Sequence, residues 1–175
     1  MFNLKNLFSM QGRSWRQVTA LLVGVLILCA VNYTIVQREQ LLQEGRVVLL
    51  ELAPVDPRSL MQGDYMALRF QIANVASDQS QESESEDGYL LATLDEHGVA
   101  QFKRRVQQRE QVGSDEVLLR YRVRNHVAKF ATNAYFFQEG KAQLYEKARY
   151  GEFRVASNGD MLLTGLRTPD YARIE

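Results

Sequence analysis

A long uncharged stretch near the N-terminus constrains this chain more than any other feature. Residues Val18 to Val36 (VTALLVGVLILCAVNYTIV) include no charged side chain over 19 positions. A helix needs roughly 20 apolar residues to cross a bilayer. The distinctly polar residues Thr19, Asn32 and Thr34 lie near the two ends of the stretch. We therefore predict a single transmembrane helix over residues 18–36.

The charges on either side of this segment predict its orientation. Lys5, Arg13 and Arg16 precede it without any acidic residue, whereas basic and acidic residues are balanced just after it. An excess of Lys and Arg beside a span marks the cytoplasmic side. We therefore expect residues 1–17 to be a cytoplasmic segment and residues 37–175 to form an extracytoplasmic domain.

A cleaved signal peptide and a lipoprotein signal are two other interpretations of the apolar segment. A cleaved signal peptide has an apolar core of roughly 7–15 residues followed by a small-residue cleavage site. Here the core is longer, and bulky or polar residues follow Ala30. Lipidation at Cys29 would need a small residue before it, where Leu28 stands. The segment is predicted to remain as a signal anchor, and the single cysteine excludes an intrachain disulfide.

The part of the chain beyond the anchor is nearly neutral. It holds 18 basic and 21 acidic residues, a net charge of −3. Domains that bind nucleic acid are usually strongly basic. Nucleic acid is therefore not expected among the partners.

One segment of the domain has the composition of a loop. Residues 77–87 (SDQSQESESED) are polar and acidic throughout. A segment without apolar side chains to bury does not offset the entropy cost of ordering. We predict a mobile acidic loop over residues 76–88, a solvated insertion between strands. An acidic recognition tail or a cation-binding loop is the alternative.

The rest of the domain shows the short period-two patterns of β-strands and lacks long helical periodicity. The anchor helix should continue to Gly45, and Asn158-Gly159 should form a tight hairpin turn with positive φ at both positions. Strands are expected at residues 46–52, 64–72, 89–94, 99–106, 116–125, 129–137, 152–156 and 161–167, and a short helix at 142–149. These elements predict an α+β fold, mostly antiparallel β: one N-terminal transmembrane helix followed by a single sheet-rich domain.

The segment before the second predicted strand differs from its neighbours in its proline content. Residues 53–63 carry two prolines and are not expected to form regular strand. The strand that follows alternates, because side chains in a strand point to opposite faces in turn. Its apolar face holds Met66, Leu68, Phe70 and Ile72, and its other face holds Tyr65, Ala67, Arg69 and Gln71.

Residues 54–70 (PVDPRSLMQGDYMALRF), together with the anchor, carry a family resemblance. They resemble the bacterial family named for its GDYxxLxY motif, small proteins with one N-terminal span. Gly63, Asp64, Tyr65 and Leu68 match the motif, and Phe70 stands where the family has tyrosine. Segments 136–140, 145–149 and 159–166 extend the likeness over most of the domain.

The resemblance implies a cellular setting without a biochemical activity. It implies a bacterial inner-membrane protein, single-pass, with its C-terminal domain in the periplasm. Members are often associated with polytopic membrane proteins. The leading hypothesis is therefore a binding or accessory domain, without catalysis, for another integral membrane protein.

The candidate binding residues are Asp64, Tyr65 and Arg69. Gly63 permits an unusual backbone angle, and Asp64 can accept hydrogen bonds from nearby backbone N–H groups. Alternation places Tyr65 and Arg69 away from the core, where they can reach a partner. A stabilised turn feeding a core strand is the plainer interpretation of the same residues.

The alternative hypothesis is a serine hydrolase. The order Pro-x-x-Leu-x-x-Gly-Asp followed later by Lys-Arg resembles membrane-anchored signal peptidases, with Ser59 as nucleophile and Lys103 as base. A Ser–Lys pair needs a desolvated lysine. Lys103 has Arg104 and Arg105 beside it, which is the setting of a solvated lysine.

No sequence pattern predicts a cofactor, a metal site or a particular small-molecule ligand. His97 in a turn and His126 at a strand end lack metal-ligand spacing, so each is expected to be an exposed polar residue. There is no phosphate-binding loop.

A basic stripe is the remaining signal. Arg120, Arg122 and Arg124 share one strand face, and Lys103 and Arg105 share another. If these strands are neighbours, the basic residues form a cationic patch for lipid headgroups or an acidic partner. Cross-strand pairing with Glu51, Glu110 or Glu152 is the plainer alternative.

Overall fold

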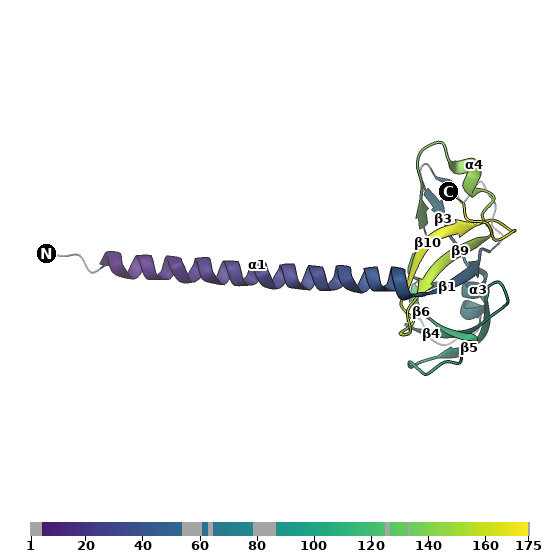
Figure 1. The fold of residues 1–175 in the computed structure, drawn as a ribbon, viewed down its shortest axis with the longest axis horizontal. Helices are drawn as coiled ribbons and strands as arrows, with labels where there is room; N and C mark the ends of the chain where they lie inside the picture. Colours follow the sequence, from purple (N-terminus) through teal and green to yellow (C-terminus); the bar gives the residue numbers. More distant parts are fainter. Residues whose placement is uncertain are drawn as a thin grey trace. The chain divides into compact units, whose positions relative to one another are not determined.

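The structure is a computed structural model of the 175-residue chain. It describes residues 5–53, 61–62, 65–78, 87–124, 127–132 and 134–174. The chain divides into two compact units, Met1–Gln40 and Leu41–Glu175. Nearly all of one long helix belongs to the first unit, and every labelled strand belongs to the second (Figure 1).

The long helix, α1, runs from Lys5 to Glu44. It begins 13 residues before the predicted span and ends at Glu44, just before Gly45, as expected. Its stretch Trp15–Glu44 is long and apolar enough to cross a membrane. The polar side chains near the ends of the apolar run bond back to carbonyls of the same helix: Thr19 Oγ1 to Trp15 at 2.6 Å, Asn32 Nδ2 to Leu28 at 2.9 Å and Thr34 Oγ1 to Ala30 at 2.7 Å. These bonds lower the cost of placing polar groups in lipid.

The second unit is built from three antiparallel sheets among the described residues. The first, in spatial order, is β1 (Arg46–Glu51), β9 (Tyr150–Val155) and β10 (Met161–Arg167). The second is β2 (Met61–Gln62), β3 (Tyr65–Ala67) and β8 (Ala134–Phe136). The third is β5 (Ala100–Val106), β4 (Gly88–Leu94), β6 (Glu116–Arg124) and β7 (Val127–Lys129). Two short helices complete it, α3 (Gln71–Asp78) and α4 (Ala142–Tyr145). The predicted fold class is confirmed.

Backbone hydrogen bonds join the sheets to one another. The Leu49 N–H donates to the Gly98 carbonyl at 2.9 Å, which ties β1 to the β4–β5 turn. The Arg120 N–H donates to the Gly159 carbonyl at 2.9 Å, which ties β6 to the β9–β10 turn. Leu52 and Phe70 form an isolated antiparallel bridge. The sheets therefore enclose one common core.

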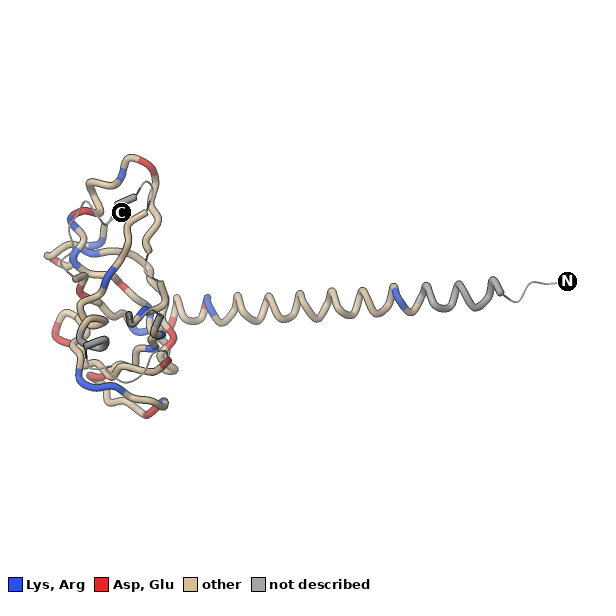
Figure 2. The backbone as a smooth tube through the Cα atoms, turned by 180° about the vertical axis from the view of Figure 1, so that it is seen from behind, with Lys and Arg blue, Asp and Glu red and all other residues tan. Residues whose placement is uncertain are grey.

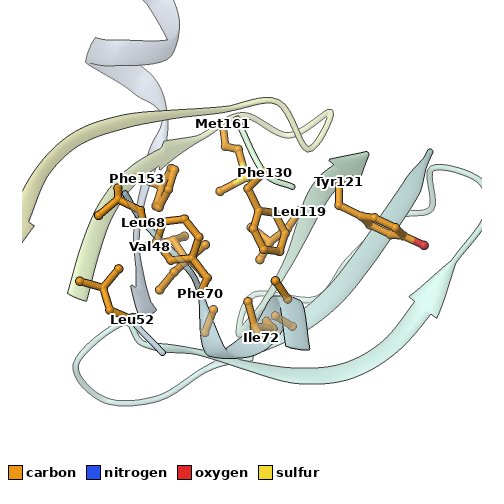
Figure 3. Close-up of a cluster of buried hydrophobic side chains, with 14 of the residues drawn as sticks. Val48, Leu52, Leu68, Phe70, Ile72, Leu119, Tyr121, Phe130, Phe153 and Met161 are labelled. Carbon is orange, nitrogen blue, oxygen red and sulfur yellow. The ribbon is translucent and has the colours of Figure 1, made fainter. Parts of the chain in front are cut away.

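That core is centred on aromatic and aliphatic residues from all parts of the domain (Figure 3). Phe70 meets Phe153 edge-on, with ring centroids 5.3 Å apart, and meets Phe130 in the same way at 6.0 Å. A Cβ at Gly151 would lie only 2.9 Å from the Phe70 ring, so this position has no room for a side chain. The predicted apolar face is confirmed, because Met66, Leu68, Phe70 and Ile72 are all buried.

The predicted strand over 64–72 is wrong in its second half. Strand β3 ends at Ala67, and residues 71–78 form helix α3. Ile72 and Ala73 are both buried while Gln71 and Asn74 are exposed, which is a helical pattern. Phe70 and Ile72 have the two-residue spacing of a strand, but Phe70 lies between β3 and α3 and Ile72 lies in α3. The helix forms because its apolar side contacts β5 and β7.

The same helix corrects the predicted acidic loop. Residues 76–78 are the last residues of α3, and Gly88 is the first of β4. Residues 79–86 lie outside the described part of the chain. The segment that joins α3 to β4 is therefore shorter than the predicted 76–88.

Three further expectations need correction. The predicted strand 129–137 is divided between β7 and β8, which belong to different sheets. Phe130 enters the core between them, and Thr132 Oγ1 accepts the N–H of Ala134 at 3.3 Å.

Residues 61–62 form β2 although no strand was expected over 53–63. In the β9–β10 turn only Gly159 has positive φ, because the Asn158 side chain instead accepts the Asp160 N–H at 2.9 Å.

Candidate functional site

The GDYxxLxY segment enters a small sheet whose two faces differ. Strand β3 pairs with β2 on one side, where Gln62 lies opposite Tyr65. It pairs with β8 on the other, where Tyr65 lies opposite Phe136. Gly63 and Asp64, for which a turn and a binding role were predicted, lie outside the described residues. Tyr65 is thus the first motif residue that the structure describes.

The outer face of this sheet holds Tyr65, Ala67, Ala134 and Phe136, and is called the outer face below. The rings of Tyr65 and Phe136 are tilted at 41°, with their centroids 5.7 Å apart. Phe136 is 73% exposed, whereas Tyr65 is half-buried. The outer face therefore presents an aromatic pair to its surroundings, of which the phenylalanine is the more accessible member.

The inner face of the same sheet is an aromatic cluster continuous with the core. Phe137 stacks on Tyr145 at 4.9 Å, and Tyr135 lies 5.2 Å from the same ring. Burial, followed by a hydrogen bond with Tyr145, raises the pKa of Tyr135 above its ordinary value. Tyr135 consequently stays neutral and acts as packing.

The other motif residues separate into core and surface. Leu68 and Phe70 are 1% and 2% exposed, so their role is structural. Phe70 occupies the family's tyrosine position, and its ring packs between Phe130 and Phe153. Arg69 is exposed, and its carbonyl accepts the Ala53 N–H at 2.8 Å. Of the three candidate binding residues, the structure thus places Tyr65 and Arg69 at the surface and does not describe Asp64.

The residues of the hydrolase hypothesis are not brought into a catalytic setting. Ser59 lies outside the described residues. The Lys103 side chain is 50% exposed, and its Nζ forms an ion pair with Glu116 Oε1 at 2.5 Å. The hydrogen bond from Lys103 holds the pKa of Glu116 below its ordinary value. A general-base lysine requires desolvation, whereas Lys103 is half-exposed and paired with an acid.

The predicted cationic patch is divided in the structure. Strand β4 lies between β5 and β6, so the two basic faces are not neighbours. Arg120 pairs with Asp160 at 3.3 Å and Arg122 with Asp87 at 3.9 Å. Acidic segments are interspersed among the basic ones along the domain (Figure 2). The Arg105 guanidinium turns instead over the Tyr121 ring, 5.7 Å from its centroid.

The three acids offered as partners of the basic stripe pair with other arginines. Glu51 binds Arg149 at 2.7 Å, and Glu110 binds Arg104. Glu152 is buried and accepts Arg167 Nε at 2.6 Å and Thr164 Oγ1 at 3.0 Å. Burial alone would raise the pKa of Glu152, but these hydrogen bonds outweigh it and hold the pKa below its ordinary value. Glu152 is a structural carboxylate.

The structure also shows a pocket that was not predicted, and Gln71 and Ile72, which directly follow the motif, are among its lining residues. Asp95, Tyr150 and Tyr171 line it, and its volume is about 310 Å³. A hydrogen bond with Tyr171, followed by burial, raises the pKa of Tyr150. The turn signal Pro169-Asp170 before Tyr171 was the available clue, but nothing local indicated which strands it would meet. His97, predicted as an exposed turn residue, is exposed and touches the Tyr171 ring.

No group of three or more His, Cys, Asp or Glu residues suited to a metal ion occurs within the described ranges. His126 lies outside the described residues, so its expected exposure stays a prediction.

Comparison with known proteins identifies a sequence family. A family model described as "GDYXXLXY protein" matches residues 27–166, well over half of the chain. The match includes the last ten residues of the predicted span and both faces of the motif sheet. No curated protein and no solved structure matched the chain.

Proposed function

This chain belongs to the GDYXXLXY protein family, and from that premise we propose that it is a membrane-anchored accessory domain that binds another integral membrane protein. The α1 helix is the anchor, a single-pass signal anchor in a bacterial inner membrane. The domain contributes binding, without catalysis. Its partner contact is the outer face, with Tyr65 from the motif and Phe136 from β8, together with the exposed Arg69 two residues after β3.

The flanking charges support the orientation of the anchor. Three basic residues and no acid precede the apolar run, which favours a cytoplasmic N-terminus. The sheet domain is then periplasmic. In that compartment a domain whose only cysteine lies in the anchor helix depends on its core and not on an intrachain disulfide.

The exposed aromatic pair at the motif carries the proposal. Large aromatic side chains that remain exposed on a folded domain are typical anchors of protein interfaces. Phe136 is 73% exposed, and its ring contacts that of Tyr65. Tyr65 belongs to the GDYXXLXY motif, after which the family is named. Burying Phe136 against a partner would remove this exposure and extend the aromatic contact.

Site-specific photo-crosslinking in native membranes tests the proposal. A photoreactive phenylalanine analogue at position 136 should yield a reproducible crosslink to one membrane protein. The same analogue at Arg122, which is exposed on β6 of another sheet, serves as the matched control and should not. Identical products from both positions, or none from position 136, would contradict the proposal.

The orientation has a separate test. Cys29 is replaced by alanine, and a single cysteine is introduced at Gln108, an exposed position after β5. A membrane-impermeant maleimide that has access to the periplasm of intact cells should label this cysteine. Labelling only after lysis would overturn the periplasmic location.

A further inference from the structure

A pocket of about 310 Å³ opens where five separate segments of the domain meet, one of them the start of α3 at Gln71 and Ile72. Its wall includes Glu51 at the end of β1, Asp95 in the β4–β5 turn, Tyr150 at the start of β9 and Tyr171 in the C-terminal turn. The volume lies at the lower end of the range for small-molecule sites. We propose that this pocket binds a small organic cation through its alkylammonium group.

The charged groups of the wall favour a cation. Of the described residues that line the pocket, two are carboxylates and none is lysine, arginine or histidine. Arg149 is not a lining residue, but it donates Nη2 to Glu51 Oε1 at 2.7 Å, so it offsets the charge of Glu51. Asp95 has no cationic partner among the described residues. An anion entering here would meet negative charge.

Both carboxylates are held in fixed positions. The Oδ1 atom of Asp95 accepts the backbone N–H groups of His97 and Val99 at 2.9 and 2.8 Å. Glu51 is held by its bond to Arg149. In the described part of the chain, the second oxygen of each carboxylate accepts no hydrogen bond. These two oxygens are therefore available to a ligand that carries N–H donors or a positive charge.

The aromatic groups of the wall add a second attraction for a cation. Tyr150 and Tyr171 are stacked, with centroids 5.1 Å apart and planes at 22°. His97 meets the Tyr171 ring edge-on at 4.3 Å. The face of an aromatic ring attracts ammonium groups, which is how aromatic cages recognise quaternary amines. The alkyl groups of such a ligand would contact Phe102, a further lining residue.

The backbone at Tyr171 places its ring before any ligand arrives. Tyr171 has φ of +61°, an uncommon angle for a residue with a side chain. Its carbonyl accepts Arg167 Nη1 at 2.7 Å, and its N–H donates to the Thr168 carbonyl at 3.0 Å. These bonds hold the angle and the ring position together. A preformed site of this kind loses little entropy on binding.

Titration of the purified full-length protein tests the charge requirement. A polyoxyethylene ether detergent is suitable, because it carries neither charge nor sugar. Choline is compared with 3,3-dimethylbutan-1-ol, which has the same shape without the charge, and with methyl glucoside. Choline should bind at least about tenfold more tightly than the neutral alcohol, and added salt should weaken it. Equal binding of the two, or binding of the glucoside alone, would overturn the proposal.

Variants locate the site. Glu51→Gln and Tyr171→Leu should each weaken choline binding about three- to tenfold, whereas Tyr171→Phe should retain it. Glu110→Gln is the matched control, since Glu110 also pairs with an arginine but lies outside the pocket. Gln101→Lys adds a cation at an exposed lining position and should abolish binding without disturbing the core. Unchanged binding in Glu51→Gln and Gln101→Lys would overturn the proposal.

The ammonium group could belong to a free small molecule or to a lysine side chain. Titration with N-acetyl-lysine methylamide distinguishes these sources, because tighter binding than choline would favour a lysine. The pocket and the outer face share no residue. Loss of cation binding in Gln101→Lys should therefore leave the crosslink from position 136 intact.

Discussion

Tyr65 and Leu68 of the motif lie only three residues apart in sequence, yet the two halves of the motif have opposite environments. Leu68 and Phe70 are almost fully buried and contact the centre of the core. Tyr65 and its neighbour Phe136 lie on the outer face, where the phenylalanine is largely exposed. One short motif thus supplies a structural half and a surface half. A motif residue can be indispensable for folding without touching any partner.

Removing the core ring should have the largest effect. Phe70→Ala leaves a cavity between Phe130 and Phe153 and should lower the free energy of unfolding by about 3–5 kcal/mol. Thermal and urea unfolding of the detergent-solubilised chain, followed by circular dichroism, measures this loss. Phe136→Ser is the matched control, because it also removes a phenylalanine ring, but from the exposed outer face. Similar losses in both variants would break the distinction between the core and the outer face.

The buried carboxylate should give the next largest effect, and one that depends on pH. The folded-state pKa of Glu152 is below the ordinary 4.5, so its contribution is complete above about pH 4.5 and is lost as pH falls through the folded value. Glu152→Gln should therefore cost about 1–3 kcal/mol at neutral pH. It should also reduce the acid sensitivity of the wild type. If the free energy of unfolding of Glu152→Gln fell with decreasing pH as steeply as that of the wild type, Glu152 would not contribute to acid sensitivity.

Changes on the outer face should affect partner binding and not folding. Phe136→Ser should change stability by no more than about 0.5 kcal/mol but reduce partner capture about tenfold or more. Tyr65→Phe keeps the ring and tests its hydroxyl. It should spare folding and weaken capture if that hydroxyl contacts the partner. Quantitative co-purification from membranes measures both, and full capture by Phe136→Ser would exclude this face.

The smallest effect is expected at Lys103. Solvent screens the exposed ion pair with Glu116, so Lys103→Ala should be nearly neutral for stability. Under the binding proposal it should also leave function intact, as should Ser59→Ala. A folded Lys103→Ala variant that lost all function in a complementation assay would favour the hydrolase alternative.

Local patterns predicted some parts of the fold well. Alternation assigned the buried residues of β6 because Leu119, Tyr121 and Val123 share one face. The strands predicted at 89–94 and 99–106 correspond to β4 and β5, which pair as neighbours. The boundary at Ala67 was missed, since Phe70 and Ile72 are spaced equally well for a strand that continues. Contacts of α3 with β5 and β7 decided that case, and they join residues far apart in sequence.

The candidate sites show the same division. Tyr65 was found because its motif is local, whereas its ring partner Phe136 lies 71 residues later and was identified only by strand pairing. The pocket was not predicted at all. Glu51, Asp95 and Tyr171 belong to separate segments without a common pattern, so no single stretch of sequence contained the signal.

The amino-acid sequence alone determined that the chain begins with a helix apolar enough to span a membrane, and that its sheets alternate between core and surface. Both properties follow from the order of neighbouring residues, because periodicity is a local quantity. Which strands pair, which basic residues meet acids and where the tyrosines enclose a pocket were decided only in the tertiary structure. Those relations depend on burying distant apolar faces against one another, and that free energy exists only once the whole domain has formed.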